Sequence, residues 1–532
     1  MRIALVCDTA WDLAPVTQWA THRGLTVETA TGLVVWVRAD PAGIADALGI
    51  HWADTPTGWH TDDTPTVPFG VRAVSGLSTH GQLWHHGIRV DTLPPIKTAG
   101  HVGYAPDQIR TAYHVQGAAE TGRGQIIGLA QWGQVPDATA IATFCQEAGL
   151  PPPALEQVAV GDITGLPTGI EATLDGEWAA AIAPQATLRY YIAPAGTDDT
   201  AWGAQVTALL HAVWTDAIVP TVLSISYGDG EDQLPAQDLQ AWAHLIAQIT
   251  ARGTTVVVSA GDSGTYGMHL MNMTQQARVE APASCPAALA VGGTALYMAL
   301  DQYEAERAWE NRVNLGATGG GYSAVFARPA YQDGLPTPPP MRAVPDVAAV
   351  ADVTTPVRTY IEGQWTLSGG TSVAAPIVAG LLACAAERAG HPFGALHDWL
   401  YQWGSQVCRD ITDGNNQCYA VPGLTAGPGW DPVTGWGAIL YDALIAHLPP
   451  GPAGASNPPV DPATLTVQEL ATAPDGQFGA ALIPLQDAAR TVQAAAEAVG
   501  QDAVAAFSQH PVGYYDAIQR AAARLWVAGV HH

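Results

Sequence analysis

Short runs of apolar residues alternate with amphipathic stretches through the middle of the chain. Several of the apolar runs are rich in β-branched residues, which predicts strands buried on both faces of a sheet. These runs are QIIGLAQW, ATLRYYIAP, PTVLSIS, TTVVVSAG and ALAVGGT. The stretches between them predict helices at LDGEWAAAIA, AWGAQVTALLHAVW and LQAWAHLIAQITARG. The alternation predicts an α/β fold, a mostly parallel sheet flanked by helices, with functional groups at the carboxyl ends of its strands.

The beginning of the chain follows a different pattern, which predicts a small α+β unit. Residues 3–6 predict a strand, residues 14–24 a helix, and residues 25–39 a hairpin that turns at Ala30–Gly32. Residues 40–52 start with Asp-Pro, which is typical of a helix start, and their end predicts a return as another strand.

Proline- and glycine-interrupted segments divide the chain into domains and linkers. The predicted divisions are an α+β unit at 1–81, a linker at 82–104, an α/β domain at 105–448, a proline-rich linker at 449–464 and an alanine-rich helical extension at 465–532. The last of these contains no catalytic constellation, so targeting, docking, oligomerisation and simple packing all stay open as its role.

Composition limits the partners and the environment. The net charge of −27 argues against nucleic acid or an anionic membrane as a partner. Only 13% of the residues are charged, which suits a protein that must tolerate acid, although a GC-rich genome would produce a similar composition. We expect no membrane span, because no window approaches 18 apolar residues, and the start of the chain does not resemble a signal peptide.

The six cysteines show no C-x-x-C spacing, so we expect neither a zinc nor a redox site. Cys408 and Cys418 could close a short disulfide loop, a pairing that their spacing leaves open.

Ser372 lies between a glycine-rich turn and a long apolar stretch, in LSGGTSVAAPIVAGLLACAAERAG. The stretch predicts a helix with Pro376 in its first turn, and the partial positive charge of a helix N-terminus favours a developing oxyanion. A hydroxyl nucleophile needs a base, yet none of the 17 histidines is followed by Gly-Thr as in subtilisin. The alternative is that Ser372 only caps the helix.

Glu171 and Asp175 are the candidate base and its support. Their spacing of four places both carboxyl groups on one face of a helix, where they can share a proton. Such a pair can accept a hydroxyl proton in acid, where histidine is already protonated. A solvated helix face is the alternative, and Glu177 lies off this face in a structural position.

Asp262 follows a predicted buried strand in VVVSAGDSGT. A carboxyl group that stays neutral can donate a hydrogen bond to an oxyanion. The alternative is an ordinary turn-forming aspartate.

Together these segments resemble the sedolisin family of serine-carboxyl peptidases, the kumamolisin and tripeptidyl-peptidase relatives. The resemblance covers about residues 100–448 and includes the motifs EATLDGEWAAAIAPQA, VVVSAGDSG, APASCPAALAVGGT, TGGGYSAVF, SGGTSVAAP and AGPGWDPVTGWG. It implies a subtilisin-like fold, with the family's triad falling on Glu171, Asp175 and Ser372 and its oxyanion-hole aspartate on Asp262.

The resemblance also implies a Ca²⁺ site in CRDITDGNNQ and AGPGWDPVTG. The implied ligands are the side chains of Asp410 and Asp431 and the backbone carbonyl groups of Ile411, Gly427 and Gly429. Oxygen ligands on glycine-rich loops suit calcium, whereas ordinary turns are the alternative.

Two residues depart from the family pattern. Gln131 stands where some members have a glutamate behind the triad, and Tyr227 stands where relatives have tryptophan. The first departure shortens the acidic relay, so we expect it to alter the pH profile.

Residues 1–81 resemble the second half of the family's prodomain. This implies a zymogen whose own prodomain acts as intramolecular inhibitor and folding aid, with the activation cut within 82–104. We predict a monomeric, acid-acting serine-carboxyl endopeptidase of protein or peptide substrates, secreted or resident in an acidic compartment. The alternatives are an exopeptidase that releases tripeptides and a catalytically silent binding protein of the same fold.

Overall fold

The structure is a computed structural model of the 532-residue chain. It describes residues 1–8, 10, 13–55, 58–61, 63–78, 84–85, 88–89, 103–196, 201–267, 277–311, 316–335, 339–419 and 421–449. Contacts divide the chain into two units, Met1–Pro450 and Gly451–His532. The predicted helical extension at 465–532 lies outside the described residues.

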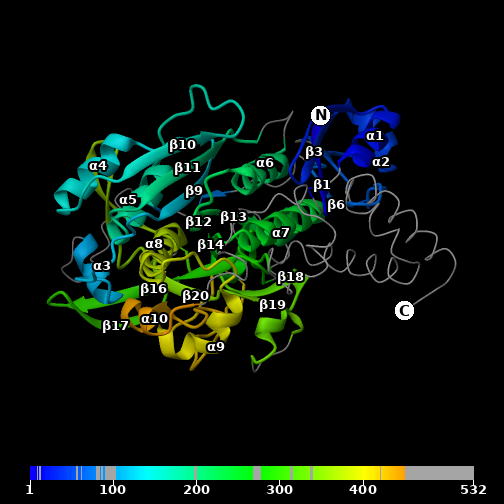
Figure 1. Cartoon of the computed structure of the whole chain (residues 1–532). Coiled ribbons are helices and arrows are strands. Elements are labelled where there is room, and N and C mark those ends of the chain that lie inside the picture. Colours follow the sequence, from blue (N-terminus) through cyan, green and yellow to red (C-terminus); the bar gives the residue numbers. More distant parts are fainter. Residues whose placement is uncertain are drawn as a thin grey trace, which may run out of the picture. The chain divides into compact units, whose positions relative to one another are not determined.

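A large, mostly parallel sheet forms the centre of the α/β domain (Figure 1). In spatial order its strands are β10 (Ala154–Ala159), β11 (Thr187–Ala193), β9 (Ile126–Trp132), β12 (Val222–Ile225), β14 (Thr255–Ser259), β16 (Leu289–Ala299), β20 (Val347–Val350), β24 (Ala438–Ile439) and β23 (Cys408–Arg409), with β17 (Gln302–Ala308) antiparallel to β16. All five strands predicted from apolar runs are present in it. The predicted α/β fold is confirmed.

Helices cover both faces of this sheet. They are α3 (Pro106–Ala112), α4 (Ala138–Glu147), α5 (Ile170–Ile182), α6 (Trp202–Thr215), α7 (Ala236–Ala251), α8 (Thr371–Ala389), α9 (His397–Val407) and α10 (Tyr441–Ala446). Along β14, Val257 belongs to the core that contains α5 and α8, whereas Val256 and Val258 belong to the core that contains α6 and α7. Burial on both faces explains why the strands are uninterrupted apolar runs.

Helix α8 is the central helix of one core. It is long and apolar enough to cross a membrane by length and composition, contrary to the expectation that no segment approaches this property. Every residue from Thr371 to Ala386 is buried in the protein, so packing accounts for its apolar character. Gly380 allows close approach to α5, because a Cβ there would lie 2.6 Å from the Cβ of Ile182.

The N-terminal unit is an α+β fold with its own core. It contains β1 (Arg2–Cys7), α1 (Ala14–His22), β2 (Thr26–Thr31), β3 (Val34–Arg38), α2 (Pro41–Leu48), β4 (Ala53–Thr55), β5 (Gly58–His60) and β6 (Val71–Ser75). The predicted hairpin is the β2–β3 pair, and Asp40 caps α2 by accepting a hydrogen bond from the Gly43 N–H at 2.7 Å. Strand β6 was not predicted, and it pairs with β1.

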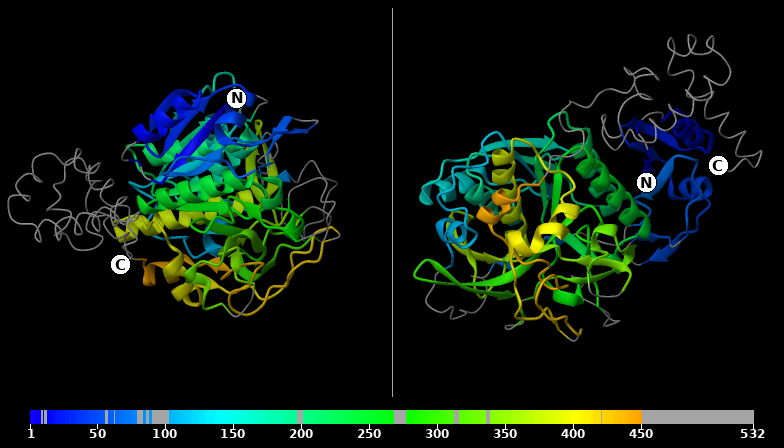
Figure 2. Two further views of the ribbon diagram at one scale, coloured as in Figure 1. Left: turned by 90° about the vertical axis from the view of Figure 1, so that its right-hand side faces the viewer. Right: turned by 60° about the horizontal axis from the view of Figure 1, so that its bottom comes forward.

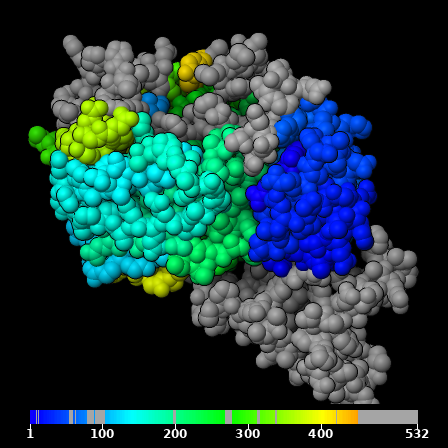
Figure 3. Space-filling model, turned by 90° about the horizontal axis from the view of Figure 1, so that it is seen from above, coloured from blue at the N-terminus to red at the C-terminus, as the bar shows by residue number. Residues whose placement is uncertain are grey.

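The N-terminal unit packs against α6 and α7, as Figures 2 and 3 show by the blue segment beside green ones. At this interface Asp238 of α7 accepts hydrogen bonds from the Ser75 hydroxyl at 2.5 Å and from the Gly76 N–H at 3.0 Å. His211 and His244 bond the carbonyl oxygens of Thr31 and Cys7. Burial raises the pKa of Asp238 to about 6.

We predict that Asp238→Asn stabilises the protein at neutral pH. Folding raises the pKa of Asp238, so the contribution of this residue to the free energy of unfolding is greatest at low pH and is lost as the pH rises through about 6. The difference between the ordinary pKa of 3.8 and the raised pKa corresponds to about 3 kcal/mol in the free energy of unfolding. Thermal unfolding in a Ser372→Ala background should show that Asp238→Asn increases stability, by an amount that grows from pH 4 to pH 7. An increase in stability that does not depend on pH would contradict this role.

Candidate active site

Ser372 is the second residue of α8. Gly370 occupies the N-cap position with φ of +105°, a conformation that favours glycine, so Ser372 is not the capping residue. Pro376 is the sixth residue of the helix and not part of its first turn, which corrects the expectation. Because proline has no N–H, it cannot make the usual helical bond to the Ser372 carbonyl. The Ser372 side chain is buried, and its Oγ lies 3.4 Å from the carbonyl oxygen of Ser226.

Glu171 and Asp175 lie one turn apart on α5, and both are buried with exposures of 1% and 0%. The alternative of a solvated helix face is therefore wrong. Burial raises the pKa of Asp175 well above its ordinary value, and the nearby Glu171 carboxyl group raises it further. Glu177 on the same helix is also buried and accepts hydrogen bonds from the Tyr360 N–H at 3.1 Å, in keeping with a structural position.

Ser226 connects Asp175 to Ser372. It follows β12 at the carboxyl end of the strand, where its hydroxyl donates to Asp175 Oδ1 at 2.7 Å. Its carbonyl oxygen accepts from Ser372 Oγ. The structure thus brings Glu171, Asp175 and Ser372 together on two packed helices, with Ser226 at a strand end between Asp175 and Ser372. Sequence reasoning missed Ser226, although its place at the end of a predicted strand was an available signal.

A chain of neutral polar groups continues behind Asp175. Gln131 Nε2 donates to Asp175 Oδ2 at 2.6 Å, and the Tyr227 hydroxyl donates to Gln131 Oε1 at 3.0 Å. Gln134 Nε2 in turn donates to the Tyr227 hydroxyl at 2.6 Å. Burial raises the pKa of Tyr227, as do the carboxyl groups of the acid pair. The two departures from the family pattern are therefore hydrogen-bonded to each other. No sequence signal marked Gln134, because its partner is distant in the chain.

Asp262 lies in the turn after β14 and beside the start of α8. Its Oδ1 accepts hydrogen bonds from the backbone N–H and the hydroxyl of Thr371, both at 2.8 Å. Thr371 Oγ1 also accepts from the Gly261 N–H at 3.1 Å. Asp262 is thereby held at the N-terminus of the helix, by the residue that precedes Ser372.

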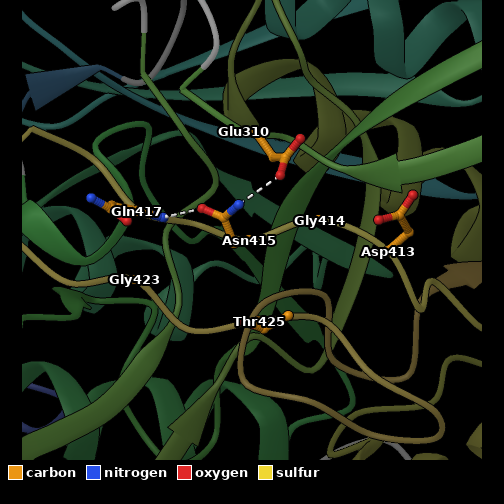
Figure 4. A pocket seen from close by; sticks show the side chains of 7 residues that line it. All are labelled: Glu310, Asp413, Gly414, Asn415, Gln417, Gly423 and Thr425. Carbon is orange, nitrogen blue, oxygen red and sulfur yellow. Dashed lines mark hydrogen bonds between the residues drawn. The ribbon is translucent and has the colours of Figure 1, made fainter.

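The loop at residues 413–425 supports the Asp262 turn and lines a pocket of 370 Å³ (Figure 4). The Asn416 carbonyl oxygen accepts from the Thr265 N–H at 3.3 Å, and Thr265 Oγ1 donates to the Pro422 carbonyl at 2.9 Å. In the pocket, Asn415 lies between Glu310 and Gln417 and donates to Glu310 Oε1 at 2.6 Å.

The predicted calcium ligands lie at both ends of this loop. Asp410 Oδ2 accepts from the Gly429 N–H at 2.8 Å, and Asp431 Oδ2 accepts from the Gly427 N–H at 3.1 Å. Across the described ranges, no group of three or more histidine, cysteine or acidic side chains could hold a metal. Two carboxylates and nearby carbonyl groups are, however, an oxygen donor set that fits calcium.

All six cysteines are free and buried. The pairing of Cys408 with Cys418 that their spacing left open is therefore not made. Burial raises the pKa of each thiol, to about 12 for Cys418, which leaves it unreactive.

Two short strands that the structure describes within the predicted linker pair with strands of the α/β domain. Strand β7 (Trp84–His85) is antiparallel to β13 (Tyr227–Gly230), which also pairs with β15 (Glu280–Ala281). Strand β8 (Ile88–Arg89) is antiparallel to β22 (Gln364–Gly369), which forms a hairpin with β21 (Val357–Ile361). A separate pair, β18 (Gly321–Ala327) and β19 (Met341–Val344), precedes β20.

Comparison with known proteins gives the class and then the family. The subtilase family model matches residues 169–403, and the fold is that of a subtilisin-like serine peptidase. Kumamolisin of Bacillus sp. (strain MN-32) is 34% identical over 468 residues, which cover 82% of this chain and 83% of that protein. The chain belongs to the sedolisin family of serine-carboxyl peptidases.

Further relatives agree with this assignment. Tripeptidyl-peptidase 1 of Bos taurus is 33% identical over 304 residues, which cover 53% of this chain and 52% of that protein. The solved structure of Pseudomonas sedolisin, a serine-carboxyl proteinase complexed with two molecules of pseudo-iodotyrostatin, has a TM-score of 0.59 at 28% identity. The match covers 65% of this chain and 98% of that one.

We predict that Gln131→Glu restricts activity to acid. A neutral glutamic acid can donate to Asp175 as the amide does, but above its pKa it loses that proton and repels the acid pair. The titratable groups that face Asp175 are Glu171, Tyr190 and Tyr227. Measured across pH, kcat/KM relative to wild type should be near 1 in acid and fall towards neutral pH.

Gln131→Met is the matched control, because it has a similar shape but no donor and no titrating group. It should lower kcat/KM by a similar factor at every pH. Identical pH profiles for wild type and Gln131→Glu would contradict the prediction.

Proposed function

We propose that the protein is an acid-acting endopeptidase in which Glu171, Asp175 and Ser372 form the catalytic triad and Asp262 forms part of the oxyanion hole. The observation that carries this proposal is the connection of Ser372 and Asp175 through the single residue Ser226, beside the buried Glu171. No imidazole is needed in this arrangement, which suits acid.

In this mechanism Glu171 accepts the Ser372 hydroxyl proton while Oγ attacks the scissile carbonyl carbon. Asp175 holds Glu171 and shares a proton with it, in keeping with the raised pKa of Asp175. Glu171 then returns the proton to the leaving amine, and water hydrolyses the acyl-enzyme by the same path in reverse.

Protonated Asp262 and the Ser372 N–H stabilise the oxyanion of each tetrahedral intermediate. Thr371 supports this role. Its N–H and its hydroxyl both donate to Asp262 Oδ1, so the proton of the neutral carboxyl group would be on Oδ2. The N-terminus of α8 adds favourable electrostatic potential at the same place.

The paired strands β7 and β8 favour an endopeptidase over an enzyme that releases tripeptides. Their partners are β13, which begins directly after Ser226, and β22, which ends two residues before Thr371, and this arrangement supports a substrate chain that continues on both sides of Ser372. The same pairing, together with the interface around Asp238, supports residues 1–81 as an inhibitory prodomain of a zymogen. Such an enzyme works after export or in an acidic compartment.

Calcium would be held by Asp410 and Asp431 with the carbonyl groups of Ile411, Gly427 and Gly429. The ion would fix the two ends of the loop at residues 413–425. That loop bonds the Asp262 turn, so calcium would stabilise the oxyanion hole from a distance.

The test of this function is hydrolysis of unstructured peptides from pH 2 to pH 7. We expect wild type to be active in acid, and Ser372→Ala and Glu171→Gln to be inactive. Asp262→Ala should lose about 10²–10³ in kcat, the usual effect of removing an oxyanion donor. Circular dichroism would establish that each variant is folded. Near-normal turnover by folded Asp262→Ala would refute its role, and an inactive wild type would leave the binding-protein alternative.

Removal of calcium should destabilise the protein. A chelator should lower the thermal unfolding midpoint of Ser372→Ala protein, and added calcium should restore it. A double variant, Asp410→Asn with Asp431→Asn, should unfold at one temperature with or without the chelator. Titration calorimetry should show calcium binding to the parent protein alone. A parent that neither binds calcium nor responds to the chelator would exclude the site.

A further inference from the structure

Gln134 contacts the start of the helix that carries the acid pair. It follows β9 by two residues, and its Oε1 accepts a hydrogen bond from the Ala172 N–H at 3.4 Å. The first N–H groups of a helix have no acceptor within the helix, and the N-cap residue of α5 is Gly169, which has no side chain to supply one. A Cβ added at Gly169 would overlap Gln134 Oε1. The Gln134 amide therefore occupies the place of a capping side chain, beside Glu171.

Two backbone N–H groups fix the direction of the hydrogen bonds from Gln134 onwards. A backbone N–H can only donate, so the bond from Ala172 directs Gln134 Oε1 to α5 and leaves Nε2 for the Tyr227 hydroxyl at 2.6 Å. Burial raises the pKa of Tyr227, and hydrogen bonds from Gln134 and from the Trp132 backbone lower it. These two donors occupy both lone pairs of the hydroxyl oxygen, so its proton is directed to Gln131 Oε1 at 3.0 Å.

The same direction continues to the acid pair. Because Gln131 Oε1 accepts from Tyr227, Gln131 Nε2 is the group that faces Asp175, and it donates to Oδ2 at 2.6 Å. The Ser226 hydroxyl donates to the other oxygen, Oδ1, at 2.7 Å. Asp175 thus accepts from both of these neighbours and can pass its proton to neither. Glu171 is the nearby carboxyl group with which that proton can be shared.

Resting on the function proposed above, we propose that Gln134 is a positioning residue that sets the direction of this hydrogen-bond chain. The chain in turn keeps the proton of Asp175 available to Glu171. In the opposite direction, Gln131 Oε1 would face Asp175 and draw the proton away from Glu171. Glu171 would then lose the hydrogen bond that holds it for proton transfer from Ser372.

Gln134→Met tests this role, because methionine has a similar length but cannot donate to Tyr227. In assays of peptide hydrolysis it should lower kcat about tenfold, the order of effect expected for one lost hydrogen bond, and leave KM unchanged. Gln157→Met is the matched control, because Gln157 is exposed on the edge strand β10, and this variant should hydrolyse peptides as wild type does. A wild-type kcat for Gln134→Met would overturn the proposal.

Gln134→Glu tests the direction of the chain. In acid its neutral carboxyl group can accept from Ala172 and donate to Tyr227 as the amide does, so kcat should be near that of wild type. The ionised carboxylate can only accept, so kcat should fall towards neutral pH. The titratable groups that face the chain are Glu171, Asp175, Tyr190 and Tyr227. A variant as impaired in acid as Gln134→Met would contradict the proposed direction.

Tyr227→Phe separates this role from simple capping of α5. Phenylalanine keeps the ring but removes the hydroxyl group, so Gln134 is no longer connected to Gln131. Gln134→Met should then cause no further loss of kcat, whereas loss of the cap should lower the thermal unfolding midpoint equally in both backgrounds. An equal loss of kcat in both backgrounds would show that Gln134 acts only through the stability of α5, and would overturn the proposal.

These outcomes separate the two proposals. If wild type hydrolyses peptides and Ser372→Ala does not, but the Gln134 variants match wild type, only the positioning role is wrong. If wild type hydrolyses nothing at any pH, the proposed function is wrong as well.

Discussion

The burial of two carboxyl groups one helical turn apart is the constraint on which the site depends. Water cannot stabilise a charge on Asp175 there, and the nearby Glu171 carboxyl group disfavours that charge further, so the pKa of Asp175 is raised well above its ordinary value. The groups that surround the pair and donate hydrogen bonds to it are neutral. Ser226 and Gln131 each donate to a different oxygen of Asp175 and bring no further charge. A histidine in their place would add a positive charge in acid and remove the need for a shared proton.

The fold brings these groups together by packing two apolar helices on one face of a parallel sheet. Helices α5 and α8 are almost wholly buried, and Gly380 allows their close approach. The same apolar composition that makes α8 resemble a membrane span is what keeps Ser372 and the acid pair away from water. Glu171 and Ser372 lie in the first turns of their helices, and Ser226 and Asp262 follow strand ends, where backbone donors are available.

The N-terminal unit and the peptidase domain are linked by contacts of two kinds. Side chains such as Asp238 and Ser75 hold the unit against α6 and α7, far in sequence from Ser372. The described linker residues in β7 and β8 contribute backbone pairing with β13 and β22.

The sequence by itself determined the fold class, the buried strands and the i, i+4 carboxyl pair, because hydrophobic period and local spacing are properties of short segments. It also carried the family motifs from which Glu171, Asp175, Asp262 and Ser372 were predicted. Only the tertiary structure decided that Ser226 joins Asp175 to Ser372 and that Gln134 extends the hydrogen-bonded chain behind Asp175. It also decided that Cys408 and Cys418 stay unpaired. These are contacts between residues far apart in the chain, and no local pattern encodes which of many distant partners a polar group will meet.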